Sequence, residues 1–564
     1  MRFQPLAALA ALTLTALIPA SAREPVRARR AMVVAQEPLA ADVGAAVLKS
    51  GGNAVDAAVA VAFALAVTHP FAGNIGGGGF ALIRFAGGHA TFIDFREEAP
   101  GAASHDMYLD AAGQPTRDSL EGWRAAGVPG TVRGLEMAHQ KYGHKPWAEL
   151  VQPAIDLAAQ GFELSYSAAK SLCDASPLLE RFPDSKRIFL RLNGRKASGC
   201  PEPGDKLVQP ELAGTLARIA RDGAQDFYAG ETAQRLAVAM KANGGLITLE
   251  DLKNYRAVER PPLEGAYKGY GILTAPPPSS GGVALLEMLG MLEGTGYEKP
   301  GAGSAASAHY LAEVMRRAYA DRAEFLGDSD FVHIPVKGLL NPRYLARLRS
   351  TIDPARATPS TLIGHGDAPA FEAGATTHFN VIDEQGNAVS LTYTLNGGYG
   401  NGVSVPGLGF LLNNEMDDFA AKPGTPNLFG LIQGEANAIA PRKRPLSSMT
   451  PAIVTRGDKL YMVLGAPGGA RIINGVLQVI LNVLDWKMDV QQAVDQPRLH
   501  HQWKPDCIYL ERGFSPDTIA LLRQMGHEVE PDAGAVASVE ALRVDGGWIQ
   551  AAQNGRSNGK AAGY

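Results

Sequence analysis

The chain changes character abruptly at residue 376, and this boundary constrains the fold more than any other feature of the sequence. Residues 353–375 (DPARATPSTLIGHGDAPAFEAGA) are rich in Pro, Ala and Gly and lack periodicity, which predicts an exposed, mobile segment. The next residues, THFNVID, alternate between apolar and polar side chains. EQGN is typical of a turn, and AVSLTYTLN alternates again. The pattern predicts a β-hairpin that begins at Thr376.

The turn also predicts a register for this hairpin. If Asp383 pairs with Ala388, then Thr377 lies opposite Thr394, and a slip of one residue is left open. In either register, Thr376 begins one strand beside the end of its neighbour. Hydroxyl groups therefore gather at the point where the composition changes.

A threonine at this boundary suggests a chemical role. A threonine hydroxyl is a weak nucleophile and needs an adjacent base, and a chain-terminal threonine can use its own α-amine, with a pKa near 8. Cleavage between Ala375 and Thr376 would create such a terminus. Threonine is also common in strands for structural reasons, so the hairpin alone favours the structural interpretation.

The first 22 residues are typical of a cleaved signal peptide. Arg2 precedes an apolar stretch from about Leu6 to Ile18, and Ala20-Ser21-Ala22 supplies the small residues of a cleavage site. An uncleaved membrane anchor is the alternative, but the stretch is short for a span, which needs about 20 residues. We therefore expect a soluble, periplasmic or secreted protein with no membrane insertion of the mature form.

Helical and strand patterns alternate elsewhere. Residues 30–68 have apolar side chains at helical spacing, interrupted by a stop and restart at Gly51-Gly52-Asn53. Residues 129–328 are mostly helical in pattern. The run 76–79 (GGGG) precedes a strand-like FALIRF and lacks the Lys-Ser/Thr pair of a phosphate loop. Close backbone packing is therefore the better interpretation of these glycines.

Charge and composition exclude several classes. The 564 residues include 53 basic and 57 acidic side chains, spread along the chain for a net charge of −4, so we expect no nucleic-acid partner. Three cysteines are too few for a disulfide framework, and whether Cys173 pairs with Cys200 is left open. His500-His501 lacks the remaining ligands of a zinc motif. We predict no metal and no cofactor.

Long strings of the sequence carry a resemblance to a known family. They include GGNAVDAAVAVAFALAVTHP, AGNIGGGGF, DFREEAP, PPPSSGG, YADRAEFLGD, TTHFNVID, LLNNEMDDF, KRPLSSMTP and GAPGGARII. From about Ala31 to Tyr564 the chain resembles the γ-glutamyltranspeptidases, also called glutathione hydrolases. The resemblance implies the four-layer αββα fold of N-terminal nucleophile hydrolases. It also implies a precursor with a signal peptide (1–22), a large subunit (23–375) and a small subunit (376–564) that form one intertwined domain.

The resemblance also implies roles at the boundary. Thr376 is similar to the family's nucleophile and new amino terminus, and Thr394 to the residue that orients its hydroxyl. Gly468 and Gly469 resemble the oxyanion hole, whose backbone N–H groups meet the developing negative oxygen.

A γ-glutamyl donor presents an α-carboxylate and an α-ammonium group, so its site needs opposite charges. By resemblance, Arg96 binds the carboxylate, and a guanidinium can fork onto it with two hydrogen bonds. Asp418 is the strongest candidate for the ammonium group. The other implied substrate-binding residues are Asn396 and Glu415 on the ammonium side and Ser447 and Ser448 on the carboxylate side.

Two positions depart from the family pattern. Residue 415 is glutamate, where some bacterial relatives have glutamine. Residues 423–430 (PGTPNLFG) resemble a lid loop that includes Asn427, and Phe429 stands where a relative has tyrosine. We therefore expect a lid without a hydroxyl contact from its tip.

The resemblance implies a γ-glutamyltransferase and glutathione hydrolase. Its expected partners are glutathione and other γ-glutamyl compounds, amino acid or dipeptide acceptors, and the two subunits of one precursor. Two alternatives stay open: a cephalosporin or glutaryl acylase of the same fold, and a non-catalytic γ-glutamyl-binding homologue.

Overall fold

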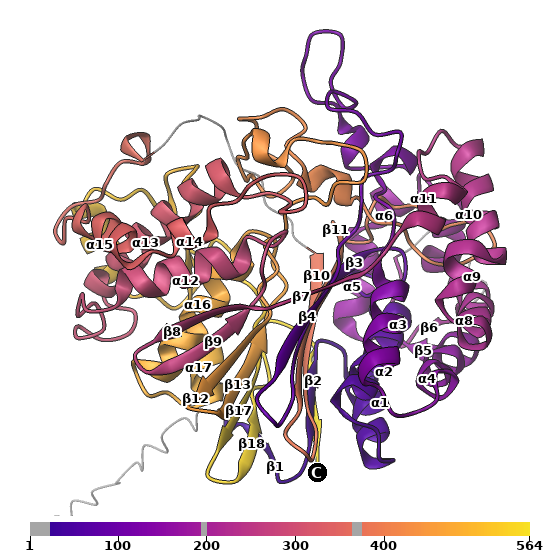
Figure 1. Ribbon diagram of the computed structural model, residues 1–564, viewed down its shortest axis with the longest axis horizontal. Helices are drawn as coiled ribbons and strands as arrows, with labels where there is room; N and C mark the ends of the chain where they lie inside the picture. Colours follow the sequence, from indigo (N-terminus) through magenta and orange to yellow (C-terminus); the bar gives the residue numbers. More distant parts are fainter. Residues whose placement is uncertain (1–22, 193–199, 364–374) are drawn as a thin grey trace, which may run out of the picture.

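Two stacked β-sheets lie between two layers of helices in the computed structural model (Figure 1), which describes residues 23–192, 200–363 and 375–564. We name the sheets after central strands. The β13 sheet has the order β1-β18-β17-β13-β12-β9-β8, and the β10 sheet has the order β19-β2-β10-β11-β3-β4-β7. This is the αββα arrangement that the resemblance implies. The predicted signal peptide and residues 364–374 lie outside the described residues.

All strand pairs within these two sheets are antiparallel. The strands are β1 Val26–Ala28, β2 Met32–Ala35, β3 Gly78–Arg84, β4 Ala90–Phe95, β5 Phe162–Glu163, β6 Lys206–Leu207, β7 Val258–Arg260, β8 Leu263–Tyr267, β9 Tyr270–Thr274, β10 Ala375–Ile382, β11 Ala388–Asn396, β12 Ala452–Arg456, β13 Lys459–Gly465, β14 Leu499–His500, β15 Ile508–Leu510, β16 Val529–Glu530, β17 Glu540–Asp545, β18 Trp548–Ala551 and β19 Lys560–Gly563.

Helices α1, α2 and α3 contact the β10 sheet, whereas α12, α16 and α17 contact the β13 sheet. The helices are α1 Pro38–Lys49, α2 Ala54–Thr68, α3 Thr131–Tyr142, α4 Trp147–Gln160, α5 Tyr166–Asp174, α6 Ser176–Leu179, α7 Pro183–Ser185, α8 Pro210–Asp222, α9 Ala224–Ala229, α10 Glu231–Ala242, α11 Leu249–Asn254, α12 Gly281–Leu292, α13 Ala305–Phe325, α14 Val336–Leu339, α15 Pro342–Ser350, α16 Arg471–Leu484, α17 Val490–Asp495 and α18 Pro516–Gln524.

The chain segments before and after residue 376 are interleaved in both sheets. Strand β10 lies between β2 from the start of the chain and β11, and β11 in turn pairs with β3. In the β13 sheet, β12 pairs with β9, and β1 pairs with β18. Two pieces cut at this point would therefore share both sheets and one core.

The hairpin forms as predicted, but the expected register is wrong by one residue. Ile382, not Asp383, pairs with Ala388, and Thr376 therefore lies directly opposite Thr394. The cause is the turn: the Asp383 N–H donates to the Asn387 carbonyl (3.0 Å), and this contact closes the loop one residue earlier.

The structure near the start of the chain also differs from the helical stretch expected over residues 30–68. The helical pattern predicted from residue 30 begins only at α1, because residues 32–35 form the fully buried strand β2. The predicted stop and restart is confirmed. Asn53 caps α2, its side chain accepts from the Asp56 N–H (2.9 Å), and the Asp56 carboxylate accepts from the Asn53 N–H (2.9 Å).

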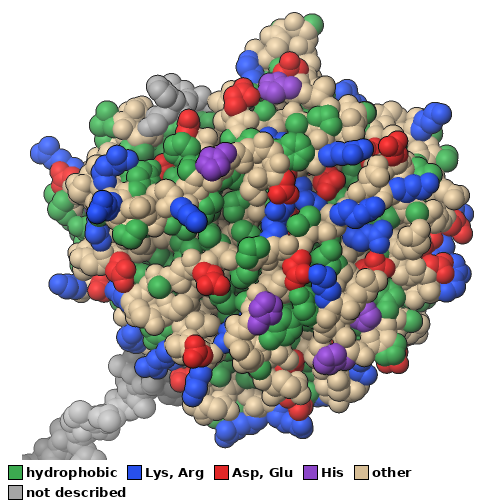
Figure 2. All heavy atoms as spheres, viewed as in Figure 1, with side chains coloured by type: hydrophobic (Ala, Val, Ile, Leu, Met, Phe, Trp, Pro, Cys, Tyr) green, Lys and Arg blue, Asp and Glu red, His purple; other side chains and the backbone are tan. Residues whose placement is uncertain are grey.

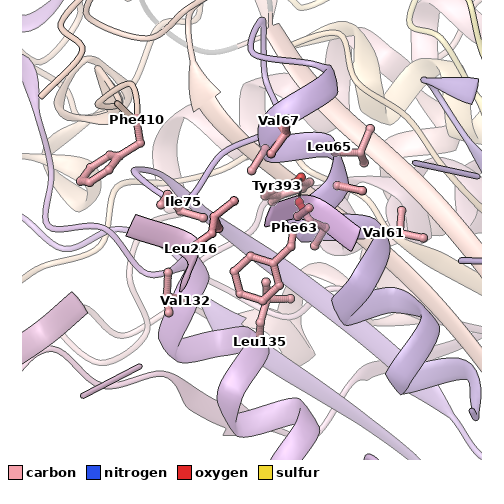
Figure 3. Close-up of a cluster of buried hydrophobic side chains, with 14 of the residues drawn as sticks. Val61, Phe63, Leu65, Val67, Ile75, Val132, Leu135, Leu216, Tyr393 and Phe410 are labelled. Atoms are coloured by element: carbon pink, nitrogen blue, oxygen red, sulfur yellow. Dashed lines mark hydrogen bonds between the residues drawn. The ribbon is translucent and has the colours of Figure 1, made fainter. Parts of the chain in front are cut away.

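Strand β10 separates an apolar face from a polar one. Phe379 and Val381 are fully buried in the core between the β10 sheet and its helices, and Figure 3 shows α2 side chains gathered around Tyr393 of β11 in the same core. His378 and Asn380 face the β13 sheet, where the Asn380 amide donates to the Glu540 carbonyl (2.9 Å). Thr376 belongs to this inner, polar row because side chains alternate along a strand.

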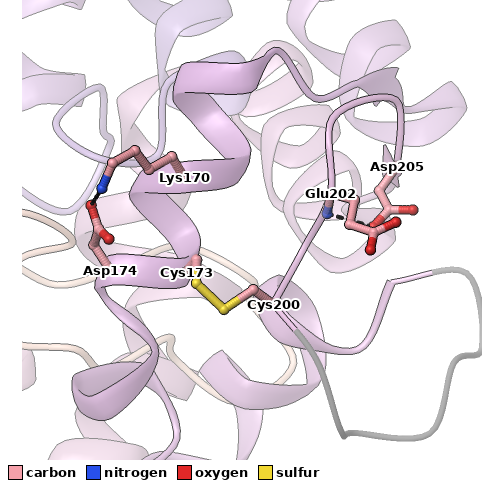
Figure 4. Close-up of a disulfide and its surroundings, with 6 residues drawn as sticks. All are labelled: Lys170, Cys173, Asp174, Cys200, Glu202 and Asp205. Atoms are coloured by element: carbon pink, nitrogen blue, oxygen red, sulfur yellow. Dashed lines mark hydrogen bonds and ion pairs between the residues drawn. A yellow bond between two sulfur atoms is a disulfide. The ribbon is translucent and has the colours of Figure 1, made fainter.

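The structure bears on three features considered from the sequence: the cysteine pair, the distribution of charged side chains, and membrane-spanning helices. Cys173 and Cys200 form a disulfide that ties α5 to a later loop (Figure 4). Acidic and basic side chains are interspersed on the face in Figure 2. Within the described residues, every helix is too short or too polar to cross a bilayer.

The two sheets approach closely at Gly465, which generates a test. A Cβ atom at Gly465 would lie 2.3 Å from Cε1 of His378. We expect Gly465→Ala to lower the free energy of unfolding by about 1–3 kcal/mol, the usual cost of overpacking a core. Gly87→Ala is the matched control, because its Cβ would meet nothing within 4 Å. Thermal unfolding measures both, and equal melting temperatures for the two variants would contradict the proposed close contact.

Candidate active site

Thr376 lies at the start of β10, and its hydroxyl meets that of Thr394. The two side-chain oxygens are 3.3 Å apart, with Thr376 donating, and both residues are at least 95 % buried. The Asn396 N–H donates to the same Thr394 oxygen (2.8 Å). Asn396 has a φ of 74°, a left-handed conformation that asparagine tolerates better than most residues. The sharp bend at the end of β11 therefore orients Thr394 toward Thr376.

The glycine run 76–79 packs against the backbone that carries Thr394. A Cβ atom at Gly77 would lie 2.0 Å from the Thr394 carbonyl oxygen, and one at Gly79 would lie 2.3 Å from that of Thr392. The Asn74 amide donates to the same Thr394 carbonyl (2.8 Å). Close backbone packing is thus the role of these glycines, as predicted.

Gly468 and Gly469 form the loop before α16. Gly469 has a φ of 55°, and a Cβ atom there would lie 2.6 Å from the Phe429 ring, so a larger residue would be both strained and blocked. The Tyr319 hydroxyl donates to the Ala470 carbonyl just after them. These contacts fix the loop, and backbone N–H groups in such a turn at a helix start can stabilise an anion.

Arg96 follows β4 and is fully buried among acidic side chains. Its guanidinium donates to Glu415 and Asp418, which lie on one 3-10 turn (Glu415–Asp418), and Nε donates to the Pro445 carbonyl (3.1 Å). Glu97 lies 3.7 Å from the same guanidinium. Three carboxylates therefore surround one arginine.

This excess of acid changes the proton affinity of the cluster. Burial raises the pKa of Glu97 to about 7 against the opposing effect of Arg96, and burial also raises the pKa of Glu415 well above its ordinary value. Burial lowers the pKa of Arg96. The neighbouring carboxylates of Glu415, Asp418 and Glu97 raise it by more, so the pKa lies above the ordinary range. The cluster therefore retains a proton near neutral pH.

The predicted lid contacts the acidic turn directly. The Asn427 amide donates to Asp418 (3.2 Å), and its carbonyl oxygen accepts from the Phe429 N–H (3.0 Å). The Leu428 N–H donates to Asp417 (2.7 Å), so both neighbouring aspartates contact the predicted lid. Phe429 is 6 % exposed, and its ring packs on Gly469.

A small cavity of about 20 Å³ collects most of the predicted residues, and a cavity of about 710 Å³ lies beyond Thr376. Thr376 and Phe429 line both. Gly468 lines only the large cavity, Asn427 lines neither, and the Ala375 side chain lies outside the described residues. The small cavity is lined by Arg96, Thr376, Thr394, Asn396, Glu415, Asp418, Phe429, Ser447, Ser448, Met449, Gly469 and Ile472.

The histidines near these elements have structural contacts. His378 Nδ1 lies 2.8 Å from the Thr392 hydroxyl and Nε2 lies 3.0 Å from Asn380, and burial lowers its pKa to about 3, so it is neutral.

A group of His309, Glu313 and His527 is the one set of described residues close enough to hold a metal ion. His309 Nε2 contacts the Asp353 carbonyl and Nδ1 contacts His527 (both 2.8 Å), and Glu313 pairs with two arginines. Both ring nitrogens of His309 and Nε2 of His527 therefore have hydrogen-bond partners, whereas His527 Nδ1 has none among the described residues.

Sequence reasoning did not single out two residues next to this site. Glu97 directly follows Arg96 in the DFREEAP string, and Arg322 lies within YADRAEFLGD. Arg322 donates to Ser448 through Nη2 (3.3 Å) and to Ser280 through Nε (3.0 Å). Both strings carried the resemblance, but only the fold shows that their charged residues meet.

The layered fold and the buried threonine at the start of a central strand define an N-terminal nucleophile hydrolase. Residues 40–564 match the family model for gamma-glutamyltranspeptidase, and the chain belongs to that family. It is 49 % identical over 508 residues to the glutathione hydrolase proenzyme of Escherichia coli, covering 90 % of this chain and 87 % of that protein.

Solved structures of other proteins share this fold. A cephalosporin acylase from Bacillus halodurans superposes with a TM-score of 0.85 at 27 % identity, covering 100 % of this chain and 99 % of that one. The γ-glutamyltranspeptidase of Helicobacter pylori gives a TM-score of 0.56 at 45 % identity, over 58 % of this chain and 93 % of that one.

The acid cluster predicts a pH-dependent stability. Because the native state holds protons that the unfolded chain releases near pH 4.5, stability falls as pH rises toward and past about 7. Glu415→Gln removes one competing carboxylate. We expect the melting temperature of this variant, relative to wild type, to be higher at pH 8.5 than at pH 5.5, with one pKa unit worth about 1.4 kcal/mol. Differential scanning calorimetry at the two pH values measures this.

Glu324→Gln is the control, because Glu324 is exposed. Its difference from wild type is expected to stay constant with pH. A Glu415→Gln difference that is equally independent of pH would contradict the shared-proton description.

Proposed function

We propose that this protein cleaves γ-glutamyl amides such as glutathione through a γ-glutamyl ester on Thr376, and passes the group to water or to an amine. The observation that supports this most directly is the small cavity, in which Thr376 lies beside a buried arginine and two buried acids. An α-amino acid end group carries one negative and one positive charge, which such a pair of opposite charges recognises. An acyl group without the ammonium would leave Glu415 and Asp418 unmatched.

Self-cleavage precedes this reaction. The Thr376 hydroxyl attacks the Ala375 carbonyl, the acyl group shifts from nitrogen to oxygen, and water hydrolyses the ester. The products are the Ala375 carboxylate and a free Thr376 α-amine, which then serves as the base for the hydroxyl. Thr394 is the residue that orients the hydroxyl, because the two oxygens lie 3.3 Å apart.

Donor binding requires an exchange of ion pairs. The small cavity has room for about one water, so a γ-glutamyl group enters only if Arg96 separates from Glu415 and Asp418. The donor carboxylate then takes the acids' place on Arg96, and the donor ammonium takes the guanidinium's place on the acids. Two ion pairs are replaced by two, which limits the net electrostatic cost of opening the site.

The large cavity is the proposed place of the amine half. Thr376 and Phe429 line both this cavity and the small one, and Gly468 lines the large cavity alone. Gly468 and Gly469 N–H groups would stabilise the oxyanion while the amine leaves into the large cavity. An acceptor amine or dipeptide would then enter from the same side and attack the ester, and water would give hydrolysis instead.

We also propose that the protein is exported. The leader-like residues 1–22 support secretion to the periplasm or the medium, and the disulfide between Cys173 and Cys200 fits an oxidising compartment.

The acylase alternative is tested by substrate choice. Glutaryl-p-nitroanilide keeps the carboxylate but lacks the α-ammonium of γ-glutamyl-p-nitroanilide. We expect the γ-glutamyl substrate to have the higher kcat/KM. A higher kcat/KM for the glutaryl substrate would contradict the γ-glutamyl assignment.

Self-cleavage before Thr376 gives a further prediction. Wild-type protein should yield two associated pieces, 23–375 and 376–564, of about 37 and about 20 kDa in proportion to their lengths within the 59.5 kDa chain. Thr376→Ala should stay in one piece and lack activity, because it has no nucleophilic oxygen. Thr376→Ser keeps an oxygen and should still cut itself. Denaturing gels and amino-terminal sequencing measure this, and the absence of a wild-type fragment that begins Thr-Thr-His would overturn the mechanism.

The large cavity gives a prediction about leaving-group size. Ala168 on α5 lines that cavity and not the small one. Ala168→Trp should raise KM for a bulky aromatic γ-glutamyl anilide by about tenfold, while γ-glutamylmethylamide, with its small leaving group, changes little. Val238→Trp, at a site 70 % exposed, is the control. Equal effects on both substrates would place the amine elsewhere.

A further inference from the structure

Arg322 is a buried cation that the reaction as described does not use. It lies on α13, is 1 % exposed, and does not line either cavity at Thr376. Within the described parts of the chain, no carboxylate lies within ion-pair distance of it, and its Nη1 atom has no hydrogen-bond partner. A buried charge without a counterion is costly, so its retention next to a site calls for an anionic ligand.

Arg322 contacts two serine side chains: Ser448, on the proposed carboxylate side of the site, and Ser280. Nη2 donates to the Ser448 hydroxyl oxygen (3.3 Å). Nε donates to the Ser280 hydroxyl oxygen (3.0 Å), and that hydroxyl donates in turn to the Ser447 carbonyl (2.7 Å). One guanidinium therefore holds the side chain of Ser448 directly and the backbone of Ser447 through Ser280.

The direction of these bonds determines where the Ser448 proton goes. A guanidinium has only donors, so the Ser448 oxygen must accept from it, and the hydroxyl keeps its own hydrogen for another acceptor. Ser448 also lines the small cavity with Arg96. The available acceptor on that side is the carboxylate of a bound donor.

The electrostatics point the same way. Burial lowers the pKa of Arg322 to about 10, so it is charged at neutral pH, and Asp418 and Arg96 are both near enough to influence it. Arg96 is already surrounded by three acids, whereas Arg322 adds positive potential that no paired carboxylate cancels. A carboxylate that enters beside Ser448 meets this potential in a low-dielectric site, where it is strong.

We infer that Arg322 is a positioning and specificity-determining residue for the α-carboxylate of the donor, acting through Ser448 and Ser280. This inference rests on the proposed γ-glutamyl activity and deepens it. It explains why the PPPSSGG string, which contains Ser280, and the YADRAEFLGD string, which contains Arg322, meet at the serine pair.

The test compares Arg322→Gln and Arg322→Lys with wild type on three p-nitroanilides, using purified protein that has been cut at Thr376. The γ-glutamyl substrate carries both charged groups, the glutaryl substrate lacks the ammonium, and the 4-aminobutyryl substrate lacks the carboxylate. We expect Arg322→Gln to raise KM for the first two by about tenfold or more and to change that of the third by less than about threefold. Arg322→Lys should restore part of the loss. If turnover of the third substrate is too slow, inhibition constants of L-glutamate, glutarate and 4-aminobutyrate give the same comparison.

Two further measurements separate positioning from simple structural support. Arg317→Gln removes an equally buried arginine on the same helix that pairs with Glu313, and it should lower stability without selecting among the substrates. In the Ser448→Ala background, Arg322→Gln should cause a smaller loss than in wild type, because the direct path through Ser448 is gone and only the path through Ser280 remains. Equal losses on all three substrates, or additive losses in the double variant, would overturn the inference.

The outcome is distinguishable from failure of the proposed function. Wild-type preference for the glutaryl over the γ-glutamyl substrate would refute the γ-glutamyl activity, yet the comparison with the 4-aminobutyryl substrate would still decide the role of Arg322.

Discussion

The position of Thr376 depends on the hydrogen bonding of β10 on both of its edges. The strand pairs with β11 along its whole length and with β2 over residues 379–382, so its geometry does not rely on the residues that precede it. Cutting the chain before Thr376 would therefore leave the strand in place. Because strands from both sides of the cut alternate in each sheet, the two pieces would remain one hydrophobic unit.

Around this strand, the molecule buries charge instead of avoiding it. Arg96, Glu415, Asp418 and Glu97 are all removed from water, and such groups persist only where partners satisfy them. In the absence of a donor, Arg96 pairs with Glu415 and Asp418, whereas both carboxylate oxygens of Glu97 lack a hydrogen-bond partner in the part of the chain that the structure describes. Under the proposed function, these paired groups would separate around a zwitterionic donor, so that the unliganded ion pairs occupy the places of the donor's own charges.

The lid and the loop before α16 are linked to this charge cluster. Asn427 contacts Asp418, Phe429 packs on Gly469, and the Gln502 amide donates to the Phe429 carbonyl (3.1 Å). Phenylalanine in place of tyrosine removes a hydroxyl from the lid tip but keeps the apolar contact with the glycine. Recognition of the acyl end and the shape of the candidate oxyanion site are thus connected through one short loop.

Much of this was predictable from sequence because it is local. The hairpin at Thr376, the helix restart at Asn53 and the close packing of the glycine run each follow from neighbouring residues, and the family strings identified the fold. The register slipped by one residue because a turn closes through a specific backbone contact that composition does not specify. The first helical stretch was partly wrong because a fully buried strand has no alternation to separate it from a helix.

The sequence by itself determined most of the elements, since those depend on chain periodicity, and its family strings predicted which residues react. Only the tertiary structure decided which distant charges meet. Arg96 and Glu415 are 319 positions apart, and Arg322 and Ser448 are 126 apart. Their pairing depends on how two sheets and α13 pack, and no local pattern encodes a contact whose two sides lie on separate layers of the fold.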